Sequence, residues 1–265
     1  MIVLPKERSK AKEYDDISKL CIVAHQGTGK THLCAQLPNS LLIDFEDGCK
    51  DYYEGASVNL KKEASKNNIT IGAAFMATIK AIKEANVSNG SPVYDFIIFD
   101  GITAMEKITH QKATAMFKTS VVGKGMINKG AVIQDVVTDV PESGWLWLHR
   151  AWEELYTDTV GLANIATVYL AHAKQGSLVK QGLKLDANDM ALTGKLKLSF
   201  LRDIDACGML YRDGNVAKLS FKTNEKDLTT KSRARHLNEA EFVISELVEG
   251  KLKTYWDLVF PQLKK

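Results

Sequence analysis

A glycine-bearing turn that ends in Gly29-Lys30-Thr31 carries the residue types in this sequence best suited to chemistry. The apolar residues 20–23 precede the turn and predict a short buried strand, and a helix is expected from His32 onward. A strand, such a turn and a helix in this order form the P-loop arrangement, in which backbone amides and the helix N-terminus face a polyphosphate. Lys30 would then reach the terminal phosphates, and the Thr31 hydroxyl would ligate Mg²⁺.

The turn departs from the formal pattern G-x-x-x-x-G-K-[ST] at its first position, where Ala24 replaces glycine. Alanine fits a tight turn only at negative φ, and a positive φ there would cost about 1 kcal/mol or more. A glycine-rich turn that binds nothing is the alternative interpretation. The residues expected to bind the nucleotide are Ala24, His25, Gln26, Gly27, Thr28, Gly29, Lys30, Thr31 and His32.

A second acidic residue must complete a magnesium site, and Asp100 has the right setting for that role. The apolar residues 96–99 lead directly into Asp100, as they do when a Walker B aspartate ends a central parallel strand. A solvated aspartate that merely closes the strand is the alternative. AAA+ enzymes carry a glutamate, their general base, directly after this aspartate, but here Gly101 follows. The sequence therefore disfavours the AAA+ class and requires a base from another strand.

Glu46 is the best candidate for that base. It follows an expected buried strand at 41–45 and lies with Asp44 and Asp47 at the strand's carboxyl end, where open α/β sheets place their ligands. The run Ile43-Asp44-Phe45-Glu46 resembles the catalytic-glutamate strand of RecA-like ATPases. The resemblance implies that Glu46 orients and deprotonates the attacking water.

A later apolar strand, expected at 165–171, ends at His172. Residues 168–172 resemble the strand of the RecA-like fold that ends in a polar γ-phosphate sensor, usually glutamine, and His172 takes that position here. A histidine packed in the core is the alternative. With the small size of the chain, these motifs are similar to those of short phage-encoded RecA-core ATPases that assist single-strand annealing and recombination. The resemblance covers about residues 18–235.

This resemblance implies an ATPase that binds ATP and Mg²⁺, acts as a homo-oligomer in a ring or filament, and is stimulated by single-stranded DNA. Its DNA-binding loops would follow the Walker B strand and the sensor strand, at 121–130 and 173–185. Solvated charged insertions are the alternative for both loops. The lysines expected to hold the phosphates of the strand are Lys124, Lys129, Lys174, Lys180 and Lys184.

Oligomeric P-loop ATPases often complete the site with a cation from the neighbouring subunit. RecA-like cores present such residues after the hairpin, where this sequence has Lys231, Arg233 and Arg235. Arg233 and Arg235 are the catalytic candidates, the sequence leaves open which of the three acts, and a solvated basic loop is the alternative. The resemblance also suggests a single-strand-binding or annealing protein as a partner.

The order of predicted elements defines the fold class. Strands and helices alternate as β-α-β-α-β-α-β and precede a hairpin around 212–215, so we expect an α/β fold with a mostly parallel sheet flanked by helices and an antiparallel edge. By resemblance this is a RecA-like P-loop NTPase core. The expected domains are an N-terminal arm (1–17), the core (18–237, with an insertion at about 102–143) and C-terminal helices packed on the core (238–265). The expected core helices are 72–85, 104–118 and 145–155, and the last carries Trp145, Trp147 and Trp152, assigned to the core rather than to base stacking.

Composition sets wider bounds on the function. The 265 residues are 45% hydrophobic and 25% charged, which are ordinary globular values, and the net charge of +3 does not by itself indicate nucleic-acid binding. Four cysteines without a C-x-x-C pair predict reduced core thiols. We find no signal peptide and no apolar stretch of about 18 residues, so we expect a cytoplasmic protein without membrane contact, in the host cell if phage-encoded.

ATP hydrolysis coupled to single-stranded DNA, in recombination, annealing or replication, is the function that these features favour. A helicase or loader motor is one alternative, and a nucleotide-binding scaffold without turnover is another. A P-loop kinase is disfavoured, because the sequence has no obvious lid or acceptor-binding arginine cluster.

Overall fold

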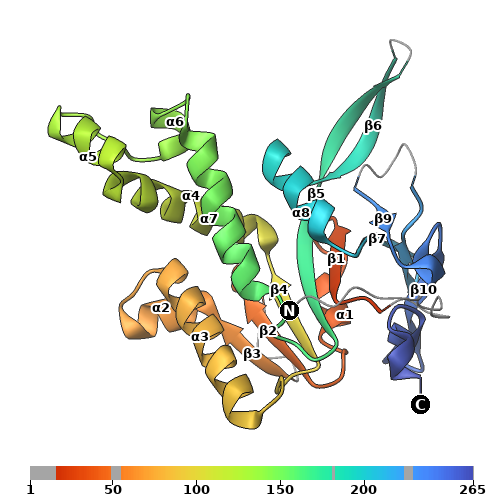
Figure 1. Ribbon diagram of the computed structural model, residues 1–265. Helices are drawn as coiled ribbons and strands as arrows, with labels where there is room; N and C mark the ends of the chain where they lie inside the picture. Colours follow the sequence, from red (N-terminus) through yellow and green to blue (C-terminus); the bar gives the residue numbers. More distant parts are fainter. Residues whose placement is uncertain (1–15, 49–54, 181–182, 224–228, 265) are drawn as a thin grey trace, which may run out of the picture.

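A mixed sheet is the frame of the molecule in the computed structural model, which describes residues 16–48, 55–180, 183–223 and 229–264 (Figure 1). The strands are β1 (Lys19–Ala24), β2 (Ser40–Asp44), β3 (Ala56–Asn59), β4 (Phe96–Asp100), β5 (Ala166–Lys180), β6 (Leu183–Met190), β7 (Ala206–Asp213), β8 (Val216–Ser220), β9 (Lys231–Ser232), β10 (Glu241–Val248) and β11 (Lys251–Thr254). Parallel pairing joins neighbours in the order β7-β1-β5-β4-β2-β3. Antiparallel β8, β10 and β11 extend the sheet beyond β7, while β6 pairs with β5 and β9 with β7.

This arrangement confirms the predicted fold class, an α/β fold with a mostly parallel sheet and an antiparallel edge. The strands predicted at 20–23 and 41–45 are β1 and β2, and the apolar residues 96–99 with Asp100 form β4. The strand at 165–171 is the first half of β5, and the hairpin around 212–215 is β7–β8. Their apolar runs are buried on both faces, as in a parallel sheet covered by helices.

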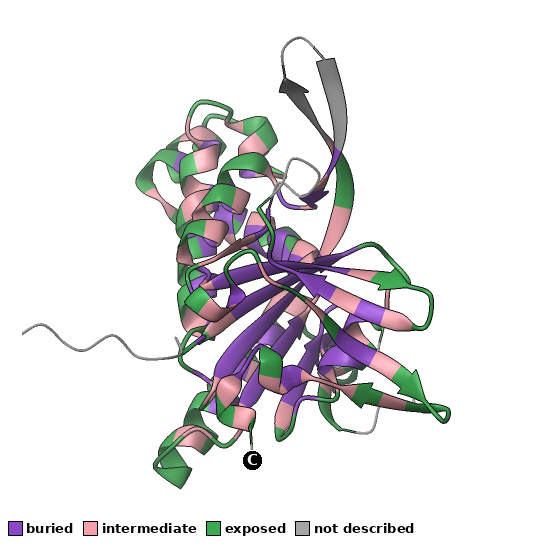
Figure 2. Cartoon of the chain, turned by 90° about the vertical axis from the view of Figure 1, so that its right-hand side faces the viewer, coloured by how far each residue is buried: buried purple, intermediate pink, exposed green. Residues whose placement is uncertain are grey.

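Helices cover both faces of the sheet, and alternate residues of each strand point to opposite layers. Ile43 and Phe99 pack in the layer that contains α3, α4, α7 and α8, whereas Leu42 and Ile98 pack in the layer of α1 and the C-terminal segment. Figure 2 shows the buried strands running between these layers. The helices are α1 (Lys30–Cys34), α2 (Leu60–Asn67), α3 (Ile71–Asn89), α4 (Ile102–Thr119), α5 (Val121–Asn128), α6 (Val136–Asp139), α7 (Gly144–Thr159) and α8 (Gly194–Asp203), with 3₁₀ turns at Arg235–Leu237, Trp256–Leu258 and Pro261–Leu263.

The predicted helices at 72–85, 104–118 and 145–155 are α3, α4 and α7, each somewhat longer than predicted. Trp152 of α7 is 1% exposed and makes an edge-to-face contact with Phe200, which confirms its assignment to the core. Trp145 and Trp147 are partly buried and pack against the same cluster. The tryptophan stripe therefore anchors α7 on the sheet.

The prediction of C-terminal helices at 238–265 is wrong. Residues 241–248 and 251–254 form the antiparallel pair β10–β11, joined by Glu249 and Gly250, which both have positive φ. Two consecutive left-handed residues make the tight turn that suits the twist of a hairpin. The β-branched residues Val243 and Ile244 favour a strand, and 3₁₀ turns follow in place of a final helix. The predicted domain boundaries, after residues 17 and 237, stay predictions.

The segment 121–130, predicted as a mobile loop, is mostly the helix α5. The Ser120 side chain accepts a hydrogen bond from the Gly123 amide and caps the helix. A side chain at Gly123 would place its Cβ 2.0 Å from the Phe117 carbonyl oxygen. This glycine therefore permits close packing between α4 and α5. The insertion at 102–143 is accordingly helical, with α4, α5 and α6.

The segment 173–185, also predicted as a loop, continues β5 beyond the sheet and returns as β6. Residues 173–180 pair with 183–190 in an antiparallel ribbon that projects from the molecule (Figure 1). The backbone groups of each strand are satisfied by the other, so a polar sequence can leave the sheet without losing its hydrogen bonds. The basic residues Lys195 and Lys197 that follow lie in α8.

Most of the predicted N-terminal arm lies outside the described residues. Ile17, which we placed in the arm, is 1% exposed and belongs to the core. Cys21, Cys34 and Cys207 are buried free thiols, as expected, and Cys49 lies outside the described residues. In the part of the chain that the structure describes, no helix is both long and apolar enough to cross a bilayer.

The close packing of β7 on β8 gives a stability prediction. A Cβ at Gly208 would lie 2.8 Å from Leu219 Cδ1 and 3.0 Å from Phe221 Cε1, and both side chains are buried. We expect Gly208→Ala to lower the free energy of unfolding by roughly 1–3 kcal/mol, measured by urea denaturation. The control is Gly125→Ala in α5, where open space should leave stability equal or slightly higher. Equal urea midpoints for wild type and Gly208→Ala would contradict the packing.

Candidate nucleotide site

The turn between β1 and α1 has the conformation that a phosphate-binding loop requires. Gly27 and Gly29 have φ of 79° and 89°, values that other residues adopt only with strain, and Gly29 is the residue before α1. Ala24 is the last residue of β1 and stays extended, so the missing first glycine introduces no strain. Backbone amides and the start of α1 therefore converge on one space.

Lys30 is buried without a strong partner. It is 7% exposed, and its Nζ lies 3.4 Å from the Ala24 carbonyl oxygen and 3.5 Å from His172 Nδ1, at the outer limit for hydrogen bonds. Burial lowers the pKa of Lys30, while the charges of Asp100 and Glu46 oppose that shift. A buried ammonium with such weak contacts has donors to spare for phosphate oxygens.

Thr31 and Asp100 form a pair suited to Mg²⁺. The Thr31 hydroxyl donates to Asp100 Oδ2 at 2.5 Å, and burial raises the pKa of Asp100 although this hydrogen bond lowers it. A hydroxyl and a carboxylate, both oxygen ligands, fit a magnesium ion that retains water in its remaining positions. Thr31 and Asp100 would thus hold the ion beside the phosphates.

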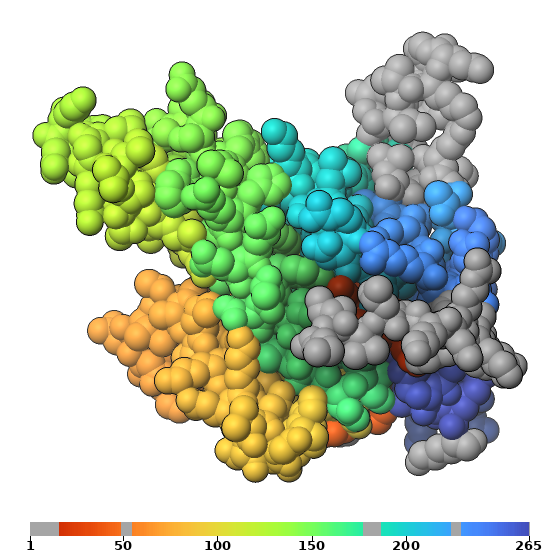
Figure 3. Space-filling model, in the orientation of Figure 1, coloured from red at the N-terminus to blue at the C-terminus, as the bar shows by residue number. Residues whose placement is uncertain are grey.

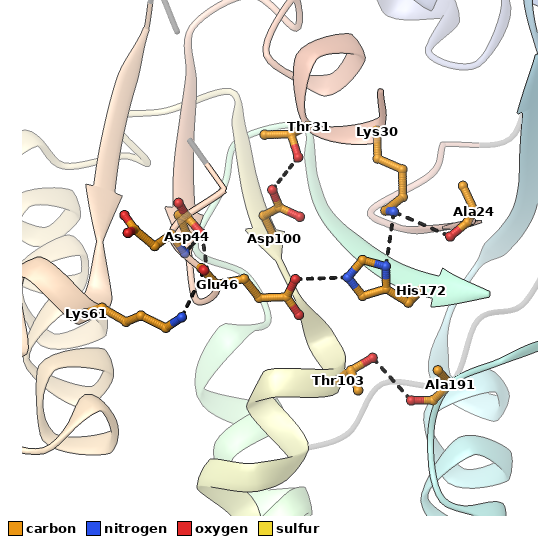
Figure 4. Close-up of polar contacts among 11 residues, drawn as sticks. Ala24, Lys30, Thr31, Asp44, Glu46, Lys61, Asp100, Thr103, His172 and Ala191 are labelled. Atoms are coloured by element: carbon orange, nitrogen blue, oxygen red, sulfur yellow. Dashed lines mark hydrogen bonds and ion pairs between the residues drawn. The ribbon is translucent and has the colours of Figure 1, made fainter. Parts of the chain in front are cut away.

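Glu46 and His172 meet opposite the P-loop (Figure 4). His172 Nε2 lies 2.9 Å from Glu46 Oε2, and because an ionised carboxylate can only accept, Nε2 is the donor of this hydrogen bond. His172 thus links Lys30 to Glu46 through a chain of polar contacts. The hydrogen bond from His172 holds the pKa of Glu46 below its ordinary value, against the effect of burial.

Two other residues, Asp44 and Gly101, determine the position of Glu46. Asp44 is fully buried, and its Oδ1 accepts the amides of Glu46 and Asp47 at 2.8 and 2.9 Å, which fixes the turn after β2. Gly101 has φ of 108°, and a Cβ there would lie 2.9 Å from Glu46 Cγ. The absence of a side chain after Asp100 therefore makes room for Glu46 itself.

Strand order brings these groups together. β5 lies between β1 and β4, and β2 is the next neighbour of β4. The register pairs Ala24 with His172 and Asp44 with Asp100, and Asp100 pairs with Leu170, two residues before His172, so these positions lie near the same edge of the parallel sheet. The carboxyl ends of neighbouring parallel strands thus supply one site, as in other open α/β sheets.

A cavity of about 490 Å³ lies between the P-loop and the Glu46–His172 pair. Of the predicted nucleotide-binding residues, Ala24, His25 and Thr28 do not line it. His25 instead contacts the ribbon through Nε2 and Asn188 Oδ1, 2.9 Å apart. The residues that do line it are Gln26, Gly27, Gly29, Lys30, Thr31, His32, Glu46, Gly48, Asp100 and His172.

Arg212 is a candidate functional residue that the sequence did not reveal. It lies in β7, next to β1, and its Nε donates to the Thr28 carbonyl oxygen at 3.0 Å. Its Nη2 is 3.0 Å from the position of a Cβ on Gly29. Arg212 thus adds a cation of the same chain to the P-loop. The neighbouring Asp-Gly turn predicted the hairpin, but only the pairing of β7 with β1 reveals the contact.

The basic residues predicted to act in trans are not brought to this site. β9, which contains Lys231, pairs with the first residues of β7, at the end of the sheet opposite the P-loop. Burial lowers the pKa of Lys231, and the Arg233 guanidinium donates to the Arg202 carbonyl. Arg235 lies in the adjoining 3₁₀ turn. Their action on a neighbouring subunit stays a prediction.

The lysines predicted to bind DNA lie on two separate projections, α5 and the β5–β6 ribbon (Figure 1). Lys124 and Lys129 are exposed, and Lys174 Nζ donates to the Leu192 carbonyl oxygen at 3.3 Å. The side chains of Lys180 and Lys184 lie outside the described residues.

Comparison with known families supports a nucleotide-binding P-loop ATPase. A family model described as an AAA domain matches residues 17–128, less than half of the chain, including the P-loop, Glu46 and Asp100. The match to a family described as an AAA domain counts against the prediction, based on Gly101, that disfavoured the AAA+ class. Glu46 nevertheless occupies the space beside Gly101. No curated protein matches the chain.

The buried carboxylate of Asp100 gives a stability prediction whose size depends on pH. Its pKa is raised on folding, so its charged form destabilises the metal-free protein above the pH at which the unfolded carboxyl ionises. We expect Asp100→Asn to raise the thermal midpoint at pH 7.5, by roughly 2–4 °C for each kcal/mol recovered, and the gain to shrink toward pH 4.

Asp213→Asn is the control of opposite sign. The Lys218 hydrogen bond holds the pKa of Asp213 low, so its replacement should leave stability equal or slightly lower at neutral pH. Thermal unfolding without nucleotide or metal measures both variants. A lower thermal midpoint for Asp100→Asn at pH 7.5 would show that the charge of Asp100 does not destabilise the metal-free protein.

Proposed function

We propose that this P-loop ATPase is RecA-like and acts on single-stranded DNA in phage recombination, annealing or replication. The observation that carries the proposal is the line from Lys30 through His172 to Glu46, which spans the cavity from the P-loop to a carboxylate on a neighbouring strand. In the proposed RecA-like arrangement, His172 would sense the γ-phosphate between Lys30, which binds the phosphates, and Glu46, which acts as the base. A homo-oligomer, with Arg233 or Arg235 acting in trans, belongs to the same proposal.

The residues divide the work of hydrolysis among them. The amides of 26–29 and the Lys30 ammonium hold the phosphates, while Glu46 accepts a proton from the attacking water. The water oxygen bonds to the γ-phosphorus as the bond from that phosphorus to the β–γ bridging oxygen breaks, which releases phosphate and ADP. Mg²⁺ held at Thr31 and Asp100 supplies charge neutralisation when bound.

Two connections support a link from this site to DNA. His172 belongs to β5, and the same strand continues into the ribbon that carries Lys174. The hydrogen bond between His25 and Asn188 joins the P-loop to the other strand of the ribbon. Loss of the γ-phosphate would therefore affect the ribbon in two ways, along β5 from His172 and through the hydrogen bond between His25 and Asn188.

ATP turnover measured with and without single-stranded DNA, at two salt concentrations, tests the proposal against its rivals. The proposal expects stimulation by the strand that weakens as salt rises, because phosphate contacts release counterions. Unwinding or translocation would favour a helicase or loader motor. Tight ATP binding with negligible turnover in every condition would favour a scaffold.

Two variants separate binding from turnover. Lys30→Ala removes the buried cation, and we expect ATP affinity to fall by roughly 30-fold or more, measured by calorimetry. Glu46→Gln keeps an acceptor for His172 but cannot take a proton, so turnover should fall roughly 10²–10⁴-fold with ATP binding retained. Lys62→Ala, an exposed change in α2, is the control. Normal turnover by Glu46→Gln would show that another residue is the base.

The hydrogen bond from His172 predicts a pH effect. It lowers the pKa of Glu46, so His172→Ala should raise that pKa and move the acid limb of the kcat profile to higher pH. His172→Gln, whose amide can donate to Glu46, should return the limb toward its original position. Unchanged limbs in both variants would mean that His172 does not tune the base.

A further inference from the structure

A second cavity, of about 850 Å³, lies on the side of Glu46 away from the P-loop. Its walls come from α2, the start of α3 and α4, and we call it the Glu46 cleft. Figure 3 shows the surface hollowed between the orange residues of α2 and α3 and the yellow-green residues of α4. Its volume is within the range of small-molecule sites. Glu46 lines both this cleft and the nucleotide cavity.

The floor of the cleft is apolar and closed. Phe45, Ile71 and Ile108 line it, and Phe45 and Ile108 are otherwise buried in the core. A Cβ at Gly72 would lie 3.2 Å from Ile108 Cγ2, so α3 and α4 meet closely behind this floor. A flat apolar group could therefore lie on a firm surface, with the polar side chains of Thr70, Thr103 and Gln111 around it.

The rim of the cleft is cationic. Lys61 uses one of its three donors for the Glu46 carbonyl oxygen, at 2.9 Å. Lys107 of α4 is exposed on the same cleft, and among the described residues it has no ion-pair partner. The one acidic side chain in the lining is Glu46, whose carboxylate is bonded to His172. Two ammonium groups beside an apolar floor match a ligand that joins a phosphate to a flat ring.

We propose that the Glu46 cleft binds a nucleoside-phosphate unit, with its phosphate between Lys61 and Lys107 and its base on the apolar floor. The unit could be part of a single strand, which rests on the proposed function, or a free mononucleotide. The hydrogen bond from Lys61 Nζ to the Glu46 carbonyl oxygen, 2.9 Å long, would place this phosphate beside the residue that lines both cavities.

The test uses the full chain with its P-loop saturated by ADP and Mg²⁺, so that neither probe takes the nucleotide cavity. The probes are fluorescent oligo-dT of 12 nucleotides, followed by anisotropy, and dTMP, followed by calorimetry. The variant is Lys107→Glu, and the matched control is Lys118→Glu, an exposed lysine of the same helix outside the cleft. We expect Lys107→Glu to weaken binding of at least one probe by about tenfold or more, and Lys118→Glu to stay within about twofold.

Each outcome has a distinct meaning. Binding of dTMP alone, lost in Lys107→Glu, supports the cleft with a free nucleotide as its ligand and counts against the DNA role. Unchanged affinity of Lys107→Glu for both probes overturns the cleft, and oligo-dT binding that survives in this variant leaves the proposed function intact. Wild type that binds neither probe overturns the cleft. A change in sedimentation of Lys107→Glu without a change in probe affinity overturns it too, and points to a second copy of the chain on this surface.

Discussion

The hydrogen bond between His172 and Glu46, made across the space that Gly101 leaves open, is the contact on which the site depends. It holds a carboxylate that follows β2 opposite a lysine at the start of α1, the helix after β1, although β1 and β2 are not neighbours in the sheet. Three separate features permit it: the turn fixed by Asp44, the bare backbone at Gly101 and the insertion of β5 between β1 and β4. Each of them contributes to the position of Glu46.

The same contact lies next to three other features of the structure, namely the P-loop, the ribbon and the Glu46 cleft. His172 contacts Lys30 through one ring nitrogen and Glu46 through the other, and it is the residue of β5 directly before the ribbon begins at Ala173. Arg212 approaches the P-loop from the other side of β1, and Glu46 lines both the nucleotide cavity and the Glu46 cleft.

The sequence predicted what depends on local chemistry, and it missed what depends on contacts between distant segments. The P-loop and the strands that end at Asp44 and Asp100 follow from apolar runs and short motifs, whereas the hydrogen bond between His172 and Glu46 was not predicted. The contact of Arg212 with Thr28 requires β7 to lie beside β1, which no local pattern states. Glycine and lysine suggested loops at 121–130 and 173–185, but helix packing and strand pairing satisfied those backbones instead. At the C-terminus, the sequence predicted a helix, but the chain forms a hairpin whose turn consists of Glu249 and Gly250, both with positive φ.

A crystal structure with ADP, Mg²⁺ and a planar γ-phosphate mimic would test the central claim most directly, because it locates the attacking water. The account predicts that a Glu46 carboxylate oxygen lies about 3 Å from that water, with His172 still bonded to the other side of the same carboxylate. A water held by a different carboxylate, with Glu46 turned away from the phosphate, would contradict it.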